Sequence, residues 1–294
     1  MVVRHSLNNR FLAFARLFAV VALLAPIAGC ELLHPSDTVP TAARKLPNLQ
    51  IPPNSVCLDV MLVERPRGDS LVGHQLWDRV DQVQSLEPDV RETLKANGFR
   101  LGVVGTNPPR ALQQLMGEKP DFQYEAAAEN AKQLSGHRFF IAAGSNVRIV
   151  ASPIHDTCEL EIEREGEPQT LALNDAECRF RLAVKQKQPG WAQLEFVPQV
   201  FHGPNQRRWA ADELDWKYEE SQRAETFFQQ RFSLTLGVGE MAVIAADGVE
   251  GKKLGQLFFT GRGVKSSQDG DEETMDVERL LIIRLTAAND SDLR

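Results

Sequence analysis

Cys158-Glu159-Leu160-Glu161-Ile162-Glu163 alternates apolar and acidic side chains one by one. Successive side chains of a β-strand point to opposite faces of a sheet, so this stretch predicts a strand with one buried face and one solvated, acidic face. Similar stretches separated by turn residues lie on both sides of it. We predict strands at 138–142, 147–151, 158–163, 169–173, 178–184 and 191–197. This spacing predicts a mainly antiparallel, sandwich-like β-domain over residues 146–290.

The residues before this domain mix strand and helix signals. Apolar runs at 56–63 and 99–104 predict strands, and helical spacing follows Leu76, Pro88 and Asn107. These signals predict a small α/β module at 55–119. Alanines at 125–134 predict a helical linker, which we place at 120–145. The whole chain is therefore expected to be α+β.

The C-terminal part carries three further apolar segments. Residues 232–245 read as a hairpin of two strands around the glycine-rich turn Gly237-Val238-Gly239-Glu240. An apolar segment at 254–259 follows, and 279–285 predicts the final strand. The acidic stretch 266–276 between them lacks the spacing of a calcium-binding loop and is expected to be a solvated loop.

The first thirty residues have the layout of an export signal. Arg4, Arg10 and Arg16 come first, without an acid before Cys30, and an uncharged apolar run at 17–28 follows. A basic segment, a short apolar segment and a small-residue cleavage site predict a signal peptide at 1–29. The proline-rich segment 30–54 predicts an extended tether.

Ile27-Ala28-Gly29-Cys30 resembles the lipobox of bacterial lipoproteins, with Ile27 where that pattern usually has leucine. The resemblance implies cleavage between Gly29 and Cys30, fatty acyl chains such as palmitate on Cys30, and membrane attachment through this lipid. Because Glu31 follows, it further implies the outer membrane, facing the periplasm. Plain secretion and an uncleaved anchor are the alternatives.

A second resemblance covers residues 146–287. The segments 194–198, 232–245, 254–258 and 280–285 are similar to parts of the secretin core domain, found in outer-membrane channel subunits of secretion systems. The resemblance implies a related, secretin-like β-domain and not a pore, because long membrane hairpins are not evident in the sequence.

The charge of the chain excludes one class of partner. It carries 33 basic and 40 acidic residues, a net charge of −7, and loss of the signal would remove only basic ones. Such a chain has no electrostatic footprint for nucleic acid. It also cannot hold an anionic membrane by charge, which leaves the lipid as the anchor.

Chemistry-bearing residues are sparse. We expect no catalytic residues, no metal site and no cofactor, because no motif of a hydrolase, zinc site or nucleotide-binding loop occurs. An exported hydrolase using His155 or His202 is an alternative, as is a glycan-binding protein using Trp191, Trp209 and Trp216.

Two small groups of residues carry further expectations. Cys158 and Cys178 lie on neighbouring predicted strands and are a candidate disulfide in an oxidising compartment, with unpaired core thiols as the alternative. Trp209, Trp216 and Tyr218 stand among charged residues and are a candidate partner contact. Together the sequence predicts a lipid-anchored, non-enzymatic envelope protein that binds an envelope protein or has a structural role.

Overall fold

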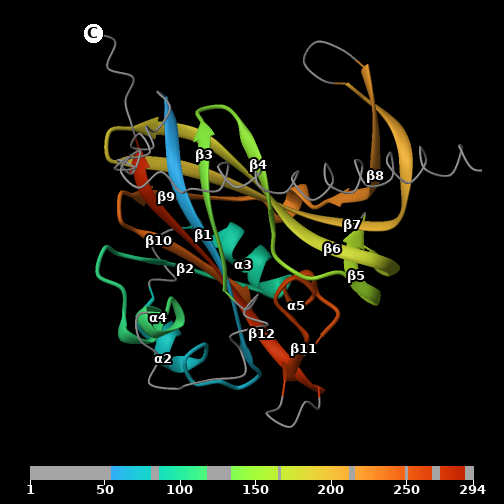
Figure 1. The fold of residues 1–294 in the computed structure, drawn as a ribbon, viewed down its shortest axis with the longest axis horizontal. Coiled ribbons are helices and arrows are strands. Elements are labelled where there is room, and N and C mark those ends of the chain that lie inside the picture. The colour runs from blue at the N-terminus through green and yellow to red at the C-terminus, as the bar shows by residue number, and fades with distance from the viewer. Residues whose placement is uncertain are drawn as a thin grey trace, which may run out of the picture. The chain divides into compact units, whose positions relative to one another are not determined.

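The computed structural model describes residues 54–80, 86–117, 134–164, 167–211, 216–248, 251–266 and 272–288. In these residues antiparallel strands form two sheets (Figure 1). The expected signal peptide, Cys30, most of the tether and the alanine-rich helix up to residue 133 lie outside the described residues. No helix in the described ranges is long and apolar enough to cross a membrane.

The first sheet joins the two ends of the described chain. Five of its six strands follow the order β2-β10-β12-β1-β3, and the sixth, β11, also pairs with β12. The strands are β1 (Ser55–Pro66), β2 (Phe99–Val104), β3 (Leu134–Ala142), β10 (Met241–Ala246), β11 (Thr260–Ser266) and β12 (Glu272–Ala288).

This pairing brings together segments that were predicted to belong to separate domains. β1 is hydrogen-bonded along its length to β12, and β2 is hydrogen-bonded to β10. The strands predicted for a separate module at 55–119 therefore complete a sheet with the C-terminal strands. They are apolar on both faces because this sheet is covered on both sides, and they do not pair with each other.

The second sheet has two long central strands and shorter strands on each edge. β6 pairs with β7, β4 and β5 share the other edge of β6, and β8 and β9 share the other edge of β7. The strands are β4 (Asn146–Val150), β5 (His155–Arg164), β6 (Glu167–Gln188), β7 (Trp191–Ala211), β8 (Trp216–Thr226) and β9 (Phe232–Gly237).

β6 replaces two predicted strands and a predicted turn. Asp175 has a φ of 50°, a left-handed conformation that aspartate tolerates, but the chain continues as a strand on both sides of it. The residues before it pair with β5 and those after it pair with β4. The Asn174-Asp175 pair therefore marks a change of edge partner and not a reversal of the chain.

The predicted hairpin at 232–245 is also wrong. β9 pairs with β7 in the second sheet, whereas β10 pairs with β2 and β12 in the first. The turn between them finds its hydrogen bonds elsewhere: Val238 N–H donates to Gly190, and Gly239 N–H donates to Leu285. Both strands are apolar because each is buried in its own sheet. Two apolar strands joined by a glycine-rich turn have the same sequence pattern as a hairpin.

Helices cover both faces of the first sheet. α2 (His74–Trp77) and α4 (Arg110–Leu115) pack on one face through a core that includes Leu76, Leu112 and Ile282. The other face packs on the second sheet, together with α3 (Pro88–Ala96) and α5 (Leu254–Phe259), through a larger core. α3 ends at Ala96, with Asn97 as its C-cap, and the following Gly98 has a φ of 77°, the left-handed conformation common after a helix end.

Aromatic rings fill the centre of the larger core. Phe180 of β6 lies 4.8 Å, centroid to centroid, from Phe258 of α5, and Phe196 stacks on Phe232 at 4.8 Å. α5 reaches this core because Gly255 lies against the backbone of Gly98, where a β-carbon would stand 1.8 Å from the carbonyl oxygen. The core thereby fixes which side chains of β6 are left to face outward.

Candidate binding surface

The outward side of β6 carries arginines. Cys178, Phe180 and Leu182 are fully buried, and the alternating residues Arg179 and Arg181 therefore point to the opposite face of the second sheet. Arg148 of β4 lies on the same face, directly opposite Arg181 in the strand register. We call Arg148, Arg179, Arg181 and the two phenylalanines whose rings lie near them, Phe201 and Phe228, the arginine face.

The pairing of Arg148 with Arg181 places two like charges at the closest cross-strand position. Ala151 N–H donates to the Cys178 carbonyl, and Val184 N–H donates to the Ser145 carbonyl. Hydrogen-bonded pairs alternate along an antiparallel ladder, so the Arg148–Arg181 pair is a non-hydrogen-bonded one, with Cα atoms about 4.5 Å apart. Like charges at such a position destabilise a sheet.

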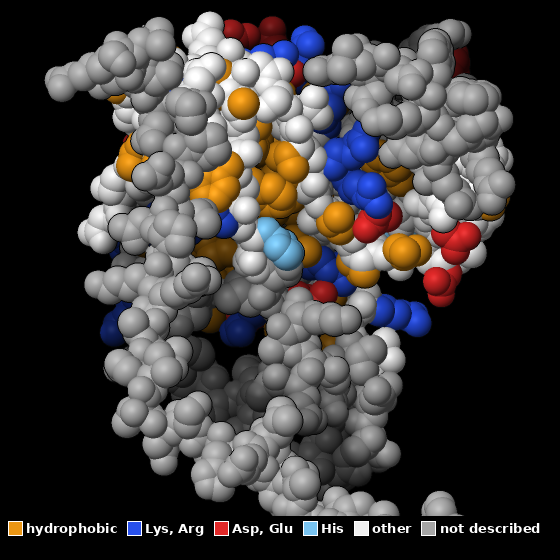
Figure 2. All heavy atoms as spheres, turned by 45° about the horizontal axis from the view of Figure 1, so that its top comes forward, with side chains coloured by type: hydrophobic (Ala, Val, Ile, Leu, Met, Phe, Trp, Pro, Cys, Tyr) orange, Lys and Arg blue, Asp and Glu red, His pale blue; other side chains and the backbone are white. Residues whose placement is uncertain are grey.

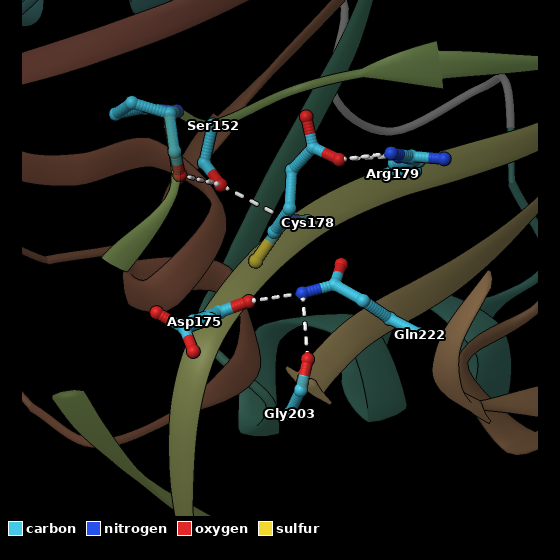
Figure 3. A network of polar contacts seen from close by, with 8 residues as sticks. Ser152, Asp175, Cys178, Arg179, Gly203 and Gln222 are labelled. Atoms are coloured by element: carbon cyan, nitrogen blue, oxygen red, sulfur yellow. Dashed lines mark hydrogen bonds and ion pairs between the residues drawn. The ribbon is translucent and has the colours of Figure 1, made fainter. Parts of the chain in front are cut away.

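The three arginines differ in their partners. Arg179 is paired with Glu177, its neighbour on β6, through a 2.6 Å bond from Nε (Figure 3). Arg148 and Arg181 have no carboxylate within ion-pair distance among the residues the structure describes. Their guanidinium groups instead lie 5.7 Å from the rings of Phe201 and Phe228, respectively.

Exposed apolar side chains accompany these charges. Phe228 is 57% exposed, and Val150, which lies opposite Arg179 in the register, is 46% exposed. Ile154, in the loop after β4, is 60% exposed. On the face of the molecule shown in Figure 2, basic side chains (blue) lie close to hydrophobic ones (orange) and to acidic ones (red). Arginine and aromatic side chains together are typical of protein-binding surfaces.

More basic than acidic groups surround the patch. Glu195 of β7 forms two ion pairs: its Oε1 lies 2.9 Å from Lys185 Nζ, and its Oε2 lies 3.8 Å from Arg231 Nε. With these two, five basic side chains share this face with Glu177 and Glu195 in the described chain. Among these named side chains, five positive charges stand against two negative ones, on a chain whose net charge is −7.

Side-chain hydrogen bonds help to hold these strands together. The hydroxyl of Ser152, which is 1% exposed, accepts from Cys178 N–H and donates to the Pro153 carbonyl (Figure 3). The amide of Gln222 on β8 donates to the carbonyls of Asp175 and Gly203. The loop after β4 is thus fixed to β6, and β8 is fixed to both central strands.

Cys158 and Cys178 are not bonded to each other, and Cys57 is also free. Cys178 is buried in the core, while Cys158 is half-buried on β5 and lies opposite Leu173 in the register. Burial raises the pKa of both thiols above the usual value. Both thiols of the candidate disulfide are free in the structure, and in the strand register Cys158 lies opposite Leu173 whereas Cys178 lies opposite Val200.

The histidines of the hydrolase alternative sit in different surroundings. His155 Nε2 lies 3.0 Å from the Leu257 carbonyl, and burial followed by the charge of Arg279 lowers its pKa. His155 and Cys158 line an open hollow of about 360 Å³ beside α5. His202 Nε2 is buried 3.9 Å from a carboxylate oxygen of Glu225. No cluster of three or more metal-ligating side chains occurs in the described ranges.

The aromatic residues singled out in the sequence lie on the β7–β8 hairpin. Trp209 pairs with Tyr218 and Ala211 pairs with Trp216 in the backbone register, but these aromatic side chains lie outside the described part of the structure. The arginine face was not predicted. The alternation of Cys178-Arg179-Phe180-Arg181 indicates that the two arginines share one face of a strand. The pairing that places Arg148 beside them could be found only from the structure.

A scan of protein-family models found no match to this chain, and a search of curated proteins found none either.

Proposed function

We propose that this chain is a lipid-anchored, non-enzymatic protein of the bacterial envelope whose β-domain binds another protein through the arginine face. The observation that carries the binding role is the Arg148–Arg181 pair. Two like charges in register, without a carboxylate partner among the described residues, cost folding free energy. Residues that break a local folding rule in this way are expected at functional sites.

The anchoring part of the proposal rests on the sequence. The basic and apolar signal ends at the lipobox-like Cys30, and a proline-rich segment separates it from the folded domain. A proline-rich segment is extended and semi-rigid, which suits a tether that lifts a domain off a bilayer. Stable attachment needs more than one acyl chain, as the lipoprotein resemblance implies for Cys30.

The resemblance to secretin core domains agrees with a binding role. We propose that residues 146–287 form a secretin-like domain in this limited sense, a β-domain that contacts other envelope proteins. The exposed phenylalanine and valine beside the arginines supply the apolar part of such a contact.

Cell fractionation and co-purification test the two parts separately. Wild-type protein is expected in the membrane fraction with a bound envelope protein. Cys30→Ala is expected in the soluble fraction, whereas Arg148→Glu/Arg181→Glu stays in the membrane and loses the partner. A Cys30→Ala protein that still fractionates with lipid contradicts the anchor. Retention of the same partner by the double variant contradicts the binding surface.

A further inference from the structure

The edge of β4 beside the arginine face is open to another strand. β4 is hydrogen-bonded to β6 on one side, and no described strand pairs with its other side. The alternation of the ladder, fixed at Ala151 and Ser145, turns the backbone N–H and C=O of Arg148 and Val150 away from β6. These groups are ready to pair with an incoming backbone.

The side chains next to this edge specify what would pair with it. A residue added opposite Arg148 on the outer face lies next to Arg148, with Arg181 one strand further away. A carboxylate there forms the ion pair that Arg148 lacks in the described chain. Two residues along the same face, the added strand meets Val150, which is 46% exposed and favours an apolar neighbour.

We propose that the arginine face binds an extended, acidic segment of a partner protein, which adds a strand to the edge of β4. The segment carries Asp or Glu opposite Arg148 and an apolar side chain opposite Val150. Its backbone supplies affinity, and these two alternate side chains supply specificity, as in other cases of strand addition. The inference rests on the proposed binding role and adds the chemistry and conformation of the partner.

A phosphate-rich ligand is the competing occupant, because arginine binds phosphate as well as carboxylate. The open backbone edge and the exposed apolar side chains favour the protein segment, because a phosphate group can neither pair with a strand edge nor make apolar contacts. The two occupants make different demands: a strand needs its own backbone N–H groups, and a phosphate needs only charge.

Fluorescence polarisation with synthetic peptides tests the inference on the full-length, lipidated protein in mild detergent. The probe is a labelled peptide of about eight residues, the length of an ordinary strand, with Glu and Val alternating on one face and Thr on the other. The controls are the same peptide with Lys for Glu, the same peptide with alternate backbone amides N-methylated, and tripolyphosphate as a competitor.

The expected result is binding of the Glu peptide that weakens with added salt and is lost in both control peptides. Each arginine exchanged for glutamine should weaken it about fivefold, as expected for an exposed ion pair of up to about 1 kcal/mol. Arg148→Glu/Arg181→Glu should weaken it more than about tenfold. Arg223→Gln is the matched control, because Arg223 is 62% exposed but lies on β8, paired with Glu225.

Three results would overturn the inference: no binding of the Glu peptide, equal binding of the N-methylated peptide, or displacement of the Glu peptide by tripolyphosphate at matched charge. Any of them would leave the proposed function standing if the double variant still loses its envelope partner in cells. If the double variant keeps its envelope partner in cells, both the proposed function and this inference fail.

Discussion

Arg148→Glu should make the protein more stable while it weakens binding of the partner. The substitution removes a like-charge pair with Arg181 and replaces it with an opposite-charge pair at the same non-hydrogen-bonded position. Each of these two changes is worth roughly 0.2–1 kcal/mol. The variant also loses the guanidinium that lies 5.7 Å from Phe201, which costs about 0.5 kcal/mol at an exposed site. The net expectation is a gain of about 0.5 kcal/mol in the free energy of unfolding.

Arg148→Gln is the control that isolates the charge. Glutamine and glutamate both lack the contact with Phe201 and are of similar size, so their difference reports the interaction of the new carboxylate with the nearby basic side chains, of which Arg181 lies directly opposite in the register. We expect Arg148→Glu to exceed Arg148→Gln by roughly 0.2–1 kcal/mol in urea unfolding at low salt. Added salt should shrink the difference, because exposed charges are screened.

The refuting result is a glutamate variant no more stable than the glutamine variant at low salt, with an unchanged urea dependence. Arg148 and Arg181 would then not repel each other in solution. The argument that the pair is retained for binding and not for folding would fail with it.

Three further outcomes are expected. Gly255→Ala should fail to accumulate as folded protein, since its β-carbon would stand 1.8 Å from the Gly98 carbonyl oxygen; normal thermal unfolding of this variant would contradict the packing of α5. His155 has a pKa lowered by burial, so the unfolded chain binds its proton first, and stability should fall as the pH falls below the ordinary value of about 6.5. His155→Gln should flatten this part of the unfolding curve and the exposed His74→Gln should not; identical curves for both would contradict the burial of His155. Cys30→Ala should leave the membrane fraction and should lack the mass of attached acyl chains in intact-protein mass spectrometry, and an acylated variant would contradict the lipobox interpretation.

Local patterns predicted individual strands well. The apolar run at 99–104 became β2 with the same bounds, and the alternation around Cys158-Leu160-Ile162 became β5. Strand propensity and alternation act over a few residues, so one sequence carries them directly.

Pairing between distant strands could not be predicted in this way. β1 and β12 bring Val56 beside Ala288, and nothing local in either strand selects that partner. β9 and β10 were predicted as a hairpin because both are apolar and a glycine-rich turn joins them. Their burial in two different sheets produces the same local pattern.

The candidate binding surface could not be predicted from the sequence for the same reason. Arg148 and Arg181 are ordinary exposed strand residues when each is read alone. Only the register between β4 and β6 makes them opposite neighbours and leaves Val150 beside them at an open edge. The lipobox-like pattern that ends at Cys30, by contrast, is contiguous, so it can be proposed from the sequence without a fold.

Site-specific photo-crosslinking in cells tests the central claim most directly. A photoreactive residue at Val150 should form an adduct with an envelope protein in the membrane fraction, and Arg181→Glu should abolish it. Val238, which is 41% exposed on the turn after β9, is the matched control and should give no adduct. Equal adducts at both positions, or none at Val150, would contradict a binding role for the arginine face.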